Sequence, residues 1–277
     1  MQTVAVTGGS GKLGRHMIQE LQNRNYRVIS LDNRVSPDLG CRQIQTDLND
    51  FGQVAGALEG ADAVIHLAAI PAPLGFTNAH IFANNAVSGF HILEAASLLG
   101  IRKAVMGSSE SSYGFAWAPS RFSPDYFPLD EYHPQKPQEC YGLSKIVNEL
   151  TGEMFHRRNG MQVISLRFST IYKPEEYDRL DVTDPERHKH TLWSYIDIRD
   201  AASACIASLE AEGCGAVSLN ITSDDTLSDW ETERLLNHCY PDVKDRRRRL
   251  QGREAVVSNR HAKGILSWSP LHSWQTR

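Results

Sequence analysis

Short apolar runs alternate with stretches of helical periodicity through the first two-thirds of this 277-residue chain, and this alternation most constrains its fold. The apolar runs that we expect to be buried strands are residues 4–6, 28–31, 63–67, 103–106 and 163–167. Apolar residues at helical spacing predict helices at 13–23, 51–58, 81–99 and 141–158. Alternation of this kind predicts an α/β protein with a doubly wound parallel sheet, whose ligands bind at the carboxyl ends of its strands.

A glycine-rich turn joins the first expected strand to the first expected helix. Gly8, Gly11 and Gly14 have the spacing of a dinucleotide-binding turn. Glycines permit a tight turn and a close approach of backbone to phosphate, and the N-terminus of the following helix attracts an anion. The turn therefore predicts a Rossmann-type nucleotide site to which Lys12 and Leu13 also contribute.

Asp32 ends the second expected strand, about 18 residues beyond Gly14. A carboxylate at this place can accept hydrogen bonds from both ribose hydroxyls and would repel a 2′-phosphate. The sequence therefore favours NAD over NADP, with Asn33 beside Asp32 in the site. Arg34 keeps NADP as the alternative.

The ends of the third and fourth strands are expected to complete the cofactor cleft. Asp47 and Leu48 would follow the third strand, where an acidic side chain can meet the adenine amino group. Asp47 would equally well cap the next helix. His66 ends the fourth strand and is interpreted as structural. The backbone after it would run close to the cofactor at Leu67, Ala68 and Ala69.

Tyr141 and Lys145 lie four residues apart, on one face of a helix if that segment is helical. A nearby cation favours the phenolate, so Tyr141 could exchange a proton with a substrate hydroxyl near neutral pH. Downstream of a glycine-rich turn, this pair predicts a nicotinamide-dependent enzyme.

Composition excludes several other kinds of protein. A formal net charge of −4 gives no general attraction to nucleic acid or to an anionic membrane. The basic run 246–249 is flanked by acidic residues, so we expect a solvated surface segment, with a phosphate or partner contact as the alternative. Five cysteines without metal-ligand spacing predict free thiols, no metal site and a cytoplasmic location.

The periodicity also suggests a division of the chain. Residues 1–172 are expected to form the NAD-binding domain with the catalytic groups, and 173–277 mainly a small substrate-binding lobe, with 195–209 returning to the core. The irregular segments 115–137 and 173–190 are candidates for a substrate pocket or lid. Aromatic residues of the first segment could form a wall for sugar stacking or a lid core: Phe115, Trp117, Phe122 and Tyr126.

These motifs, in this order, resemble the extended short-chain dehydrogenase/reductase family, and in particular its NAD-dependent epimerase/dehydratase branch. The resemblance runs from residue 1 to about 210 and adds Asn85 to the cofactor site. It implies that Ser109 hydrogen-bonds the reacting oxygen and that Tyr141 takes or gives the hydroxyl proton. Lys145 would lower the pKa of Tyr141 and hold the nicotinamide ribose. It further implies a homodimer formed through helices, including the one that carries Tyr141. Ser108 and Ser111 are the alternatives to Ser109.

Departures from the family pattern bear on the reaction. Dehydratases of the family need an acid and a base directly after the catalytic hydroxyl residue, and this chain has Glu110 and Ser111, so elimination is disfavoured. The short C-terminal lobe favours a small substrate over a nucleotide-linked one.

The lean architecture looks most like the uronate dehydrogenases, in which the residues matching Glu110 and Ser111 face the sugar. By ungapped counting, Arg179 matches the arginine that binds the substrate carboxylate there, although it would equally well be an exposed loop residue. An acidic Glu110 would disfavour a uronate unless it is protonated or turned away, so a neutral sugar or polyol is equally plausible.

The leading hypothesis is an NAD-dependent oxidoreductase that removes hydride from a hydroxyl carbon of a sugar or sugar acid, with tyrosine as the base. The alternative is a nucleotide-sugar 4-epimerase with tightly bound, recycled NAD. A binding protein without catalysis would have no need of Ser109, Tyr141 and Lys145 together.

Overall fold

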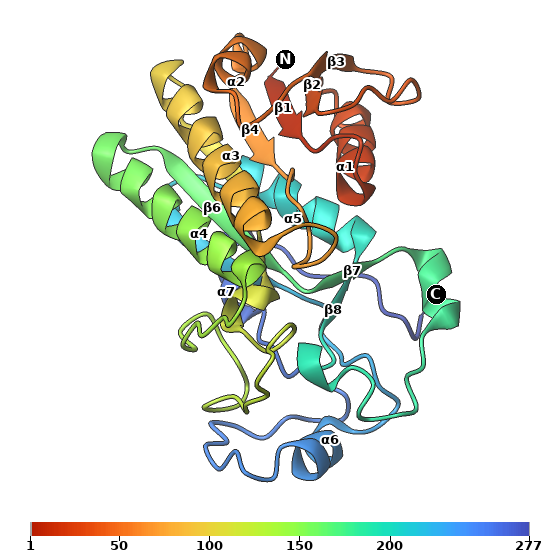
Figure 1. Cartoon of the computed structure of the whole chain (residues 1–277). Helices are drawn as coiled ribbons and strands as arrows, with labels where there is room; N and C mark the ends of the chain where they lie inside the picture. The colour runs from red at the N-terminus through yellow and green to blue at the C-terminus, as the bar shows by residue number, and fades with distance from the viewer. Residues whose placement is uncertain (1, 277) are drawn as a thin grey trace.

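A seven-stranded, wholly parallel sheet forms the centre of the protein in the computed structural model, which describes residues 2–276 (Figure 1). The strand order is β3-β2-β1-β4-β5-β6-β9. The order reverses between β1 and β4, which opens a crevice at their carboxyl ends. The predicted α/β, doubly wound fold is confirmed. The strands are β1 (Thr3–Thr7), β2 (Arg27–Asp32), β3 (Arg42–Gln45), β4 (Ala63–His66), β5 (Lys103–Ser109), β6 (Gln162–Phe168) and β9 (Ala216–Ile221).

Helices cover both faces of this sheet. One apolar core lies under α1 (Lys12–Asn23), α5 (Ile198–Glu210) and α7 (Arg260–Leu266). The other lies under α2 (Phe51–Leu58), α3 (Asn78–Leu98) and α4 (Cys140–Asn159). In β1, Val4 and Val6 enter the first core and Ala5 the second, as the two-residue period of a strand requires.

The chain returns to the sheet twice after residue 172. Helix α5 packs into the first core, and β9 pairs in parallel with β6 at the sheet edge. A separate two-stranded sheet pairs β7 (Thr170–Tyr172) with β8 (Tyr195–Asp197). The sheets are therefore built from residues on both sides of position 172, and β9 was not among the strands predicted from the sequence.

The segment 115–137 packs against the C-terminal lobe around α6 (Thr232–Cys239). Phe115, Phe127 and Leu129 share an apolar cluster with Leu235 and Trp193. Both parts of the chain therefore build one lobe below the carboxyl ends of the strands, as Figure 1 shows.

The basic run 246–249 takes part in this packing. Arg246 is half-buried, lies 4.9 Å from the Phe127 ring centroid and donates to two carbonyls of the lobe. Arg247 stacks on Tyr126 at 3.1 Å, and Arg248 is paired with Glu254. The expectation of a solvated segment is wrong for Arg246 and Arg248, which are half-buried, whereas Arg247 is exposed. Among the described residues, no helix is long and apolar enough to span a bilayer.

Candidate active site

Two adjoining cavities lie at the carboxyl ends of the strands. The first, of about 730 Å³, runs past Asp32 and Asp47. The second, of about 460 Å³, reaches Ser109, Tyr141 and Lys145. They adjoin each other, because both are lined by Gly8, Gly11, Leu67 and Ala69.

The glycine turn has the geometry of a phosphate cradle. Gly8 has φ +69°, and a Cβ on it would lie 2.8 Å from the amide nitrogen of Ala68, so a side chain there is excluded. A Cβ on Gly11 would meet only the Gly8 carbonyl oxygen within 4 Å, so a side chain at this position would project into the cleft. Helix α1 begins at the next residue, and no side chain caps it. An open cradle in front of an uncapped helix N-terminus fits a pyrophosphate.

Asp32 lines the first cavity at the end of β2. Its Oδ2 accepts a hydrogen bond from the Ser10 amide at 2.9 Å, and Oδ1 lies 3.4 Å from the Arg34 amide. The Arg34 guanidinium donates to the Ser10 carbonyl at 3.2 Å. Asn33 and Arg34 line the same cavity. A weakly engaged carboxylate oxygen at the end of β2 fits ribose hydroxyls.

Asp47 and Leu48 line the first cavity as well. Asp47 accepts a hydrogen bond from the Asn49 amide at 2.9 Å, and the cap of α2 is Asp50, which accepts from Gln53. The helix-cap alternative for Asp47 is therefore wrong.

Asn85 and His66 lie outside both sets of lining residues. The buried Asn85 amide binds the backbone of Ile70 at 2.8 and 3.0 Å, and so holds the loop that follows β4. His66 Nδ1 lies 2.8 Å from the Thr7 hydroxyl, and burial lowers its pKa to about 3. This agrees with a structural role for His66.

Tyr141 sits in the first turn of α4. The carboxylate of Glu139, the N-cap, accepts hydrogen bonds from the amides of Tyr141 and Gly142 at 2.5 and 2.7 Å. Lys145 follows one turn later, is 5% exposed and donates to the Gly107 carbonyl at 2.7 Å. Its Nζ lies 5.4 Å from the centroid of the Tyr141 ring. The helix therefore brings both side chains to the second cavity, as predicted.

Burial raises the pKa of Tyr141 to about 12, against a hydrogen bond from Ser109 that lowers it. Glu139 and Glu110 raise it further. The pKa of Lys145 is lowered to about 8 by burial, against the Glu149 carboxylate. In this structure the pKa of Tyr141 is therefore raised, because desolvation outweighs the hydrogen bond from Ser109.

Glu110 follows Ser109 and opens the short 3-10 helix η1 (Glu110–Tyr113). Its carboxylate accepts hydrogen bonds from the hydroxyls of Thr170, at 3.3 Å, and Ser194. The Ser169 hydroxyl is buried near the same carboxylate and lowers its pKa. Burial raises the pKa of Glu110 to about 7, against these donors. Ser111 lines the same cavity, and its amide donates to the Ser109 hydroxyl at 3.1 Å.

Few positively charged side chains line the second cavity. Among its described lining residues the cations are Lys12 and Lys145, and Lys12 is paired with Glu176 at 2.5 Å. Arg179 ends the 3-10 helix η2 (Pro174–Arg179), is exposed and does not line the cavity. The structure therefore does not bring Arg179 together with Ser109 and Tyr141.

The aromatic residues of segment 115–137 divide between two roles. Trp117 lines the second cavity and is 39% exposed. Phe115 and Phe122 pack on each other in the lobe at 4.9 Å, and Tyr126 is buried. Of the four, Trp117 therefore lies at the second cavity, and the other three belong to the lobe.

Sequence reasoning did not single out Ser169 and Ser194 as site residues. Each lies beside a strand, Ser169 directly after β6 and Ser194 directly before β8. The position after a strand end was an available signal for Ser169. No local signal marked Ser194, since Glu110 lies 84 residues away in the chain.

Residues 4–221 match the family described as "NAD dependent epimerase/dehydratase family". An L-arabinose 1-dehydrogenase (NAD(P)(+)) from Haloferax volcanii is 27% identical over 86% of this chain and 96% of its own. A uronate dehydrogenase from Pseudomonas putida is 28% identical over 85% and 81%. A UDP-glucose 4-epimerase from Lacticaseibacillus casei is 25% identical over 97% and 92%.

The fold is shared with solved structures. A short-chain dehydrogenase/reductase superfamily protein from Agrobacterium tumefaciens, solved with bound NAD, superposes with a TM-score of 0.77 at 21% identity. The match covers 99% of this chain and 94% of that one. The resemblance drawn from the sequence motifs is confirmed: this chain belongs to the NAD-dependent epimerase/dehydratase family.

Proposed function

We propose that this protein is an NAD-dependent dehydrogenase that oxidises a hydroxyl group of a small neutral sugar. One observation carries the proposal. The cavity that adjoins the nucleotide cleft brings Ser109, Tyr141 and Lys145 into one space with the carboxylate of Glu110.

The residues of the two cavities divide the work. NAD, held by the glycine turn and Asp32, supplies the hydride acceptor when bound. The Ser109 hydroxyl holds the reacting sugar oxygen, and Tyr141 accepts its proton as the phenolate, after releasing its own phenolic proton to solvent. The ammonium group of Lys145 lies beside the Tyr141 ring and would hold the nicotinamide ribose.

Glu110 supports a neutral substrate. Its carboxylate can accept hydrogen bonds from sugar hydroxyls, whereas above pH 7 its charge would repel a uronate. The side chains that line this cavity, among the described residues, offer a uronate no unpaired cation besides Lys145. Trp117 supplies an apolar face on which a sugar ring can stack.

The size of the site points the same way. A cavity of about 460 Å³ falls at the lower end of the range for small-molecule sites, and the nicotinamide end of the cofactor would occupy part of it. The similarity to an L-arabinose dehydrogenase over most of both chains supports a monosaccharide as the substrate.

The test is accumulation of NADH when purified protein, NAD and single aldoses, polyols or uronates are mixed. We expect net NADH with a neutral sugar and less with its uronate at pH 8. The alternative 4-epimerase would instead interconvert nucleotide sugars without net NADH and release NAD only on denaturation. That pattern would overturn the proposal.

A further inference from the structure

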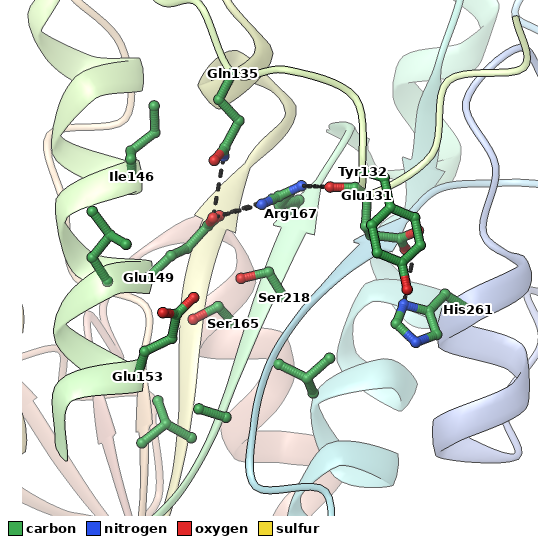
Figure 2. A pocket seen from close by; sticks show the side chains of 14 residues that line it. Glu131, Tyr132, Gln135, Ile146, Glu149, Glu153, Ser165, Arg167, Ser218 and His261 are labelled. Atoms are coloured by element: carbon green, nitrogen blue, oxygen red, sulfur yellow. Dashed lines mark hydrogen bonds and ion pairs between the residues drawn. The ribbon is translucent and has the colours of Figure 1, made fainter. Parts of the chain in front are cut away.

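A buried ion pair lies one helical turn beyond Lys145. Glu149 of α4 and Arg167 of β6 have side chains that are 5% and 6% exposed. The guanidinium grips the carboxylate with two hydrogen bonds, from Nε to Oε1 at 3.0 Å and from Nη2 to Oε2 at 2.7 Å (Figure 2). This fork geometry is the strongest kind of ion-pair contact.

Two further side chains donate hydrogen bonds to the carboxylate of Glu149. The Ser108 hydroxyl donates to Oε1 at 2.5 Å, and the Gln135 amide donates to Oε2 at 3.1 Å. Ser108 directly precedes Ser109 in β5. The carboxylate therefore ties the helix of Tyr141 and Lys145 to the strand of Ser109 and to segment 115–137.

The Nη1 group of Arg167 contacts the 3-10 helix η1 and segment 115–137. It donates to the Tyr113 hydroxyl at 2.9 Å and to the Glu131 carbonyl at 3.2 Å. Glu149 and Arg167 thus connect five parts of the chain, namely α4, β5, β6, η1 and segment 115–137.

A contribution to folding stability does not by itself explain the buried ion pair between Glu149 and Arg167. Burying two charges costs about as much as their attraction returns, and apolar side chains of similar volume often serve a core equally well. The pair also faces a third cavity of about 240 Å³, whose walls include Ser165, Ser218 and Glu153 (Figure 2).

We propose that Glu149 is a positioning residue. It supplies the counter-charge of Lys145, and through Ser108 it fixes the position of Ser109 relative to Tyr141. The roles of Ser109, Tyr141 and Lys145 in this statement rest on the proposed function.

The charges around Lys145 support this role. Tyr141, His66 and Glu149 are the titratable groups whose electrostatic or ring contacts with Lys145 the structure gives. With pKa values of about 12 and about 3, Tyr141 and His66 are neutral at pH 7. The Glu149 carboxylate raises the pKa of Lys145 against burial, which lowers it to about 8. Glu149 therefore favours the charged form of Lys145.

The first test measures Lys145 itself and needs no substrate. Competitive acetylation across a pH series, read peptide by peptide with mass spectrometry, reports the pKa of each lysine. In Glu149→Gln we expect the pKa of Lys145 to fall by about one unit. Glu153→Gln is the matched control, since Glu153 lies one turn further along α4 and lines the same third cavity. Equal Lys145 pKa values in the two variants would overturn the electrostatic role.

Glu149→Gln leaves Arg167 unpaired, so Glu149→Gln/Arg167→Gln is made beside it. The double variant removes both charges and avoids a lone buried cation. A fall in the Lys145 pKa is still expected, and it should be smaller than in Glu149→Gln alone, because the positive charge of Arg167 is removed together with the carboxylate. Glu149→Asp, which keeps the charge, should restore the wild-type value.

The second test separates the effect of Glu149 on the position of Ser109 from its electrostatic effect on Lys145. Ser108→Ala removes the hydroxyl that joins β5 to Glu149 and leaves the ion pair in place. We expect kcat to fall about tenfold, with KM and the Lys145 pKa unchanged. An unchanged kcat would overturn the role of Glu149 in positioning Ser109. If no sugar is oxidised at all but the Lys145 pKa still falls in Glu149→Gln, the proposed function fails while the electrostatic role stands.

Discussion

At the scale of single residues, Tyr141 is a phenol whose pKa is about 12, so it is protonated at neutral pH. If it accepts the substrate proton, Tyr141→Phe should lower kcat by about 10²–10⁴-fold. NAD binding, followed by NADH fluorescence, should stay within a few-fold of wild type, because the phenol lies at the far cavity from Asp32. Full activity in Tyr141→Phe would rule out the proposed base.

Glu110 predicts a pH-dependent choice between substrates. With a pKa of about 7, its carboxyl group is neutral below that pH and charged above it. The ratio of kcat/KM for a uronate to that for the matching neutral sugar should therefore fall as the pH rises from about 6 to about 8. In Glu110→Gln the ratio should stay flat over this range. A ratio that falls equally in both proteins would contradict the assignment.

Single residues also show where sequence reasoning succeeds. Gly8, Gly11 and Asp32 could be placed because each obeys a local rule about the backbone or a strand end. The raised pKa of Tyr141 could not be foreseen from its spacing to Lys145. It depends on burial, which distant parts of the chain create.

At the scale of elements, the start of α4 sets the place of Tyr141. Glu139 caps the helix by accepting from the amides of Tyr141 and Gly142. Glu139→Ala should lower the free energy of unfolding by about 1 kcal/mol, measured by urea denaturation. It should also lower kcat, because Tyr141 lies in the turn that loses its cap. Glu139→Asp, which keeps a carboxylate, is the control, and equal loss in both would contradict a capping role.

The elements found from the sequence are those with a strong period. Helix α4 and strand β6 carry clear apolar patterns and were predicted within a few residues of their bounds. Strand β9, with the sequence Ala-Val-Ser-Leu-Asn-Ile, mixes polar and apolar residues and is recognisable mainly by its pairing with β6. Pairing between segments some fifty residues apart leaves no local signal.

At the scale of the whole molecule, α3 and α4 run side by side (Figure 1). Both helices expose apolar side chains. Val87 and Phe90 of α3 and Leu143 and Leu150 of α4 are 38–55% exposed. Adjacent apolar helix faces favour self-association, so a homodimer through α3 and α4 stays our proposal. Light scattering after gel filtration should give twice the chain mass for the wild type.

Leu143→Glu/Leu150→Glu should convert that dimer to a monomer, because two buried carboxylates per subunit would face the partner. Leu271→Glu is the matched control, since Leu271 is 82% exposed and lies outside both helices. A dimer that survives the double substitution would place the interface elsewhere.

The return of the chain to the sheet through α5 and β9 limits how such a protein can be recombined. A fragment ending at residue 172 would lack the edge strand and would leave β6 open to pairing with other chains. To exchange the substrate lobe for that of a relative, the two sequences must therefore be joined at several points. The elements β8, α5 and β9 must all remain those of the host protein. New specificity in this architecture should arise more readily by changing the loops that meet at Glu110 than by shuffling whole segments.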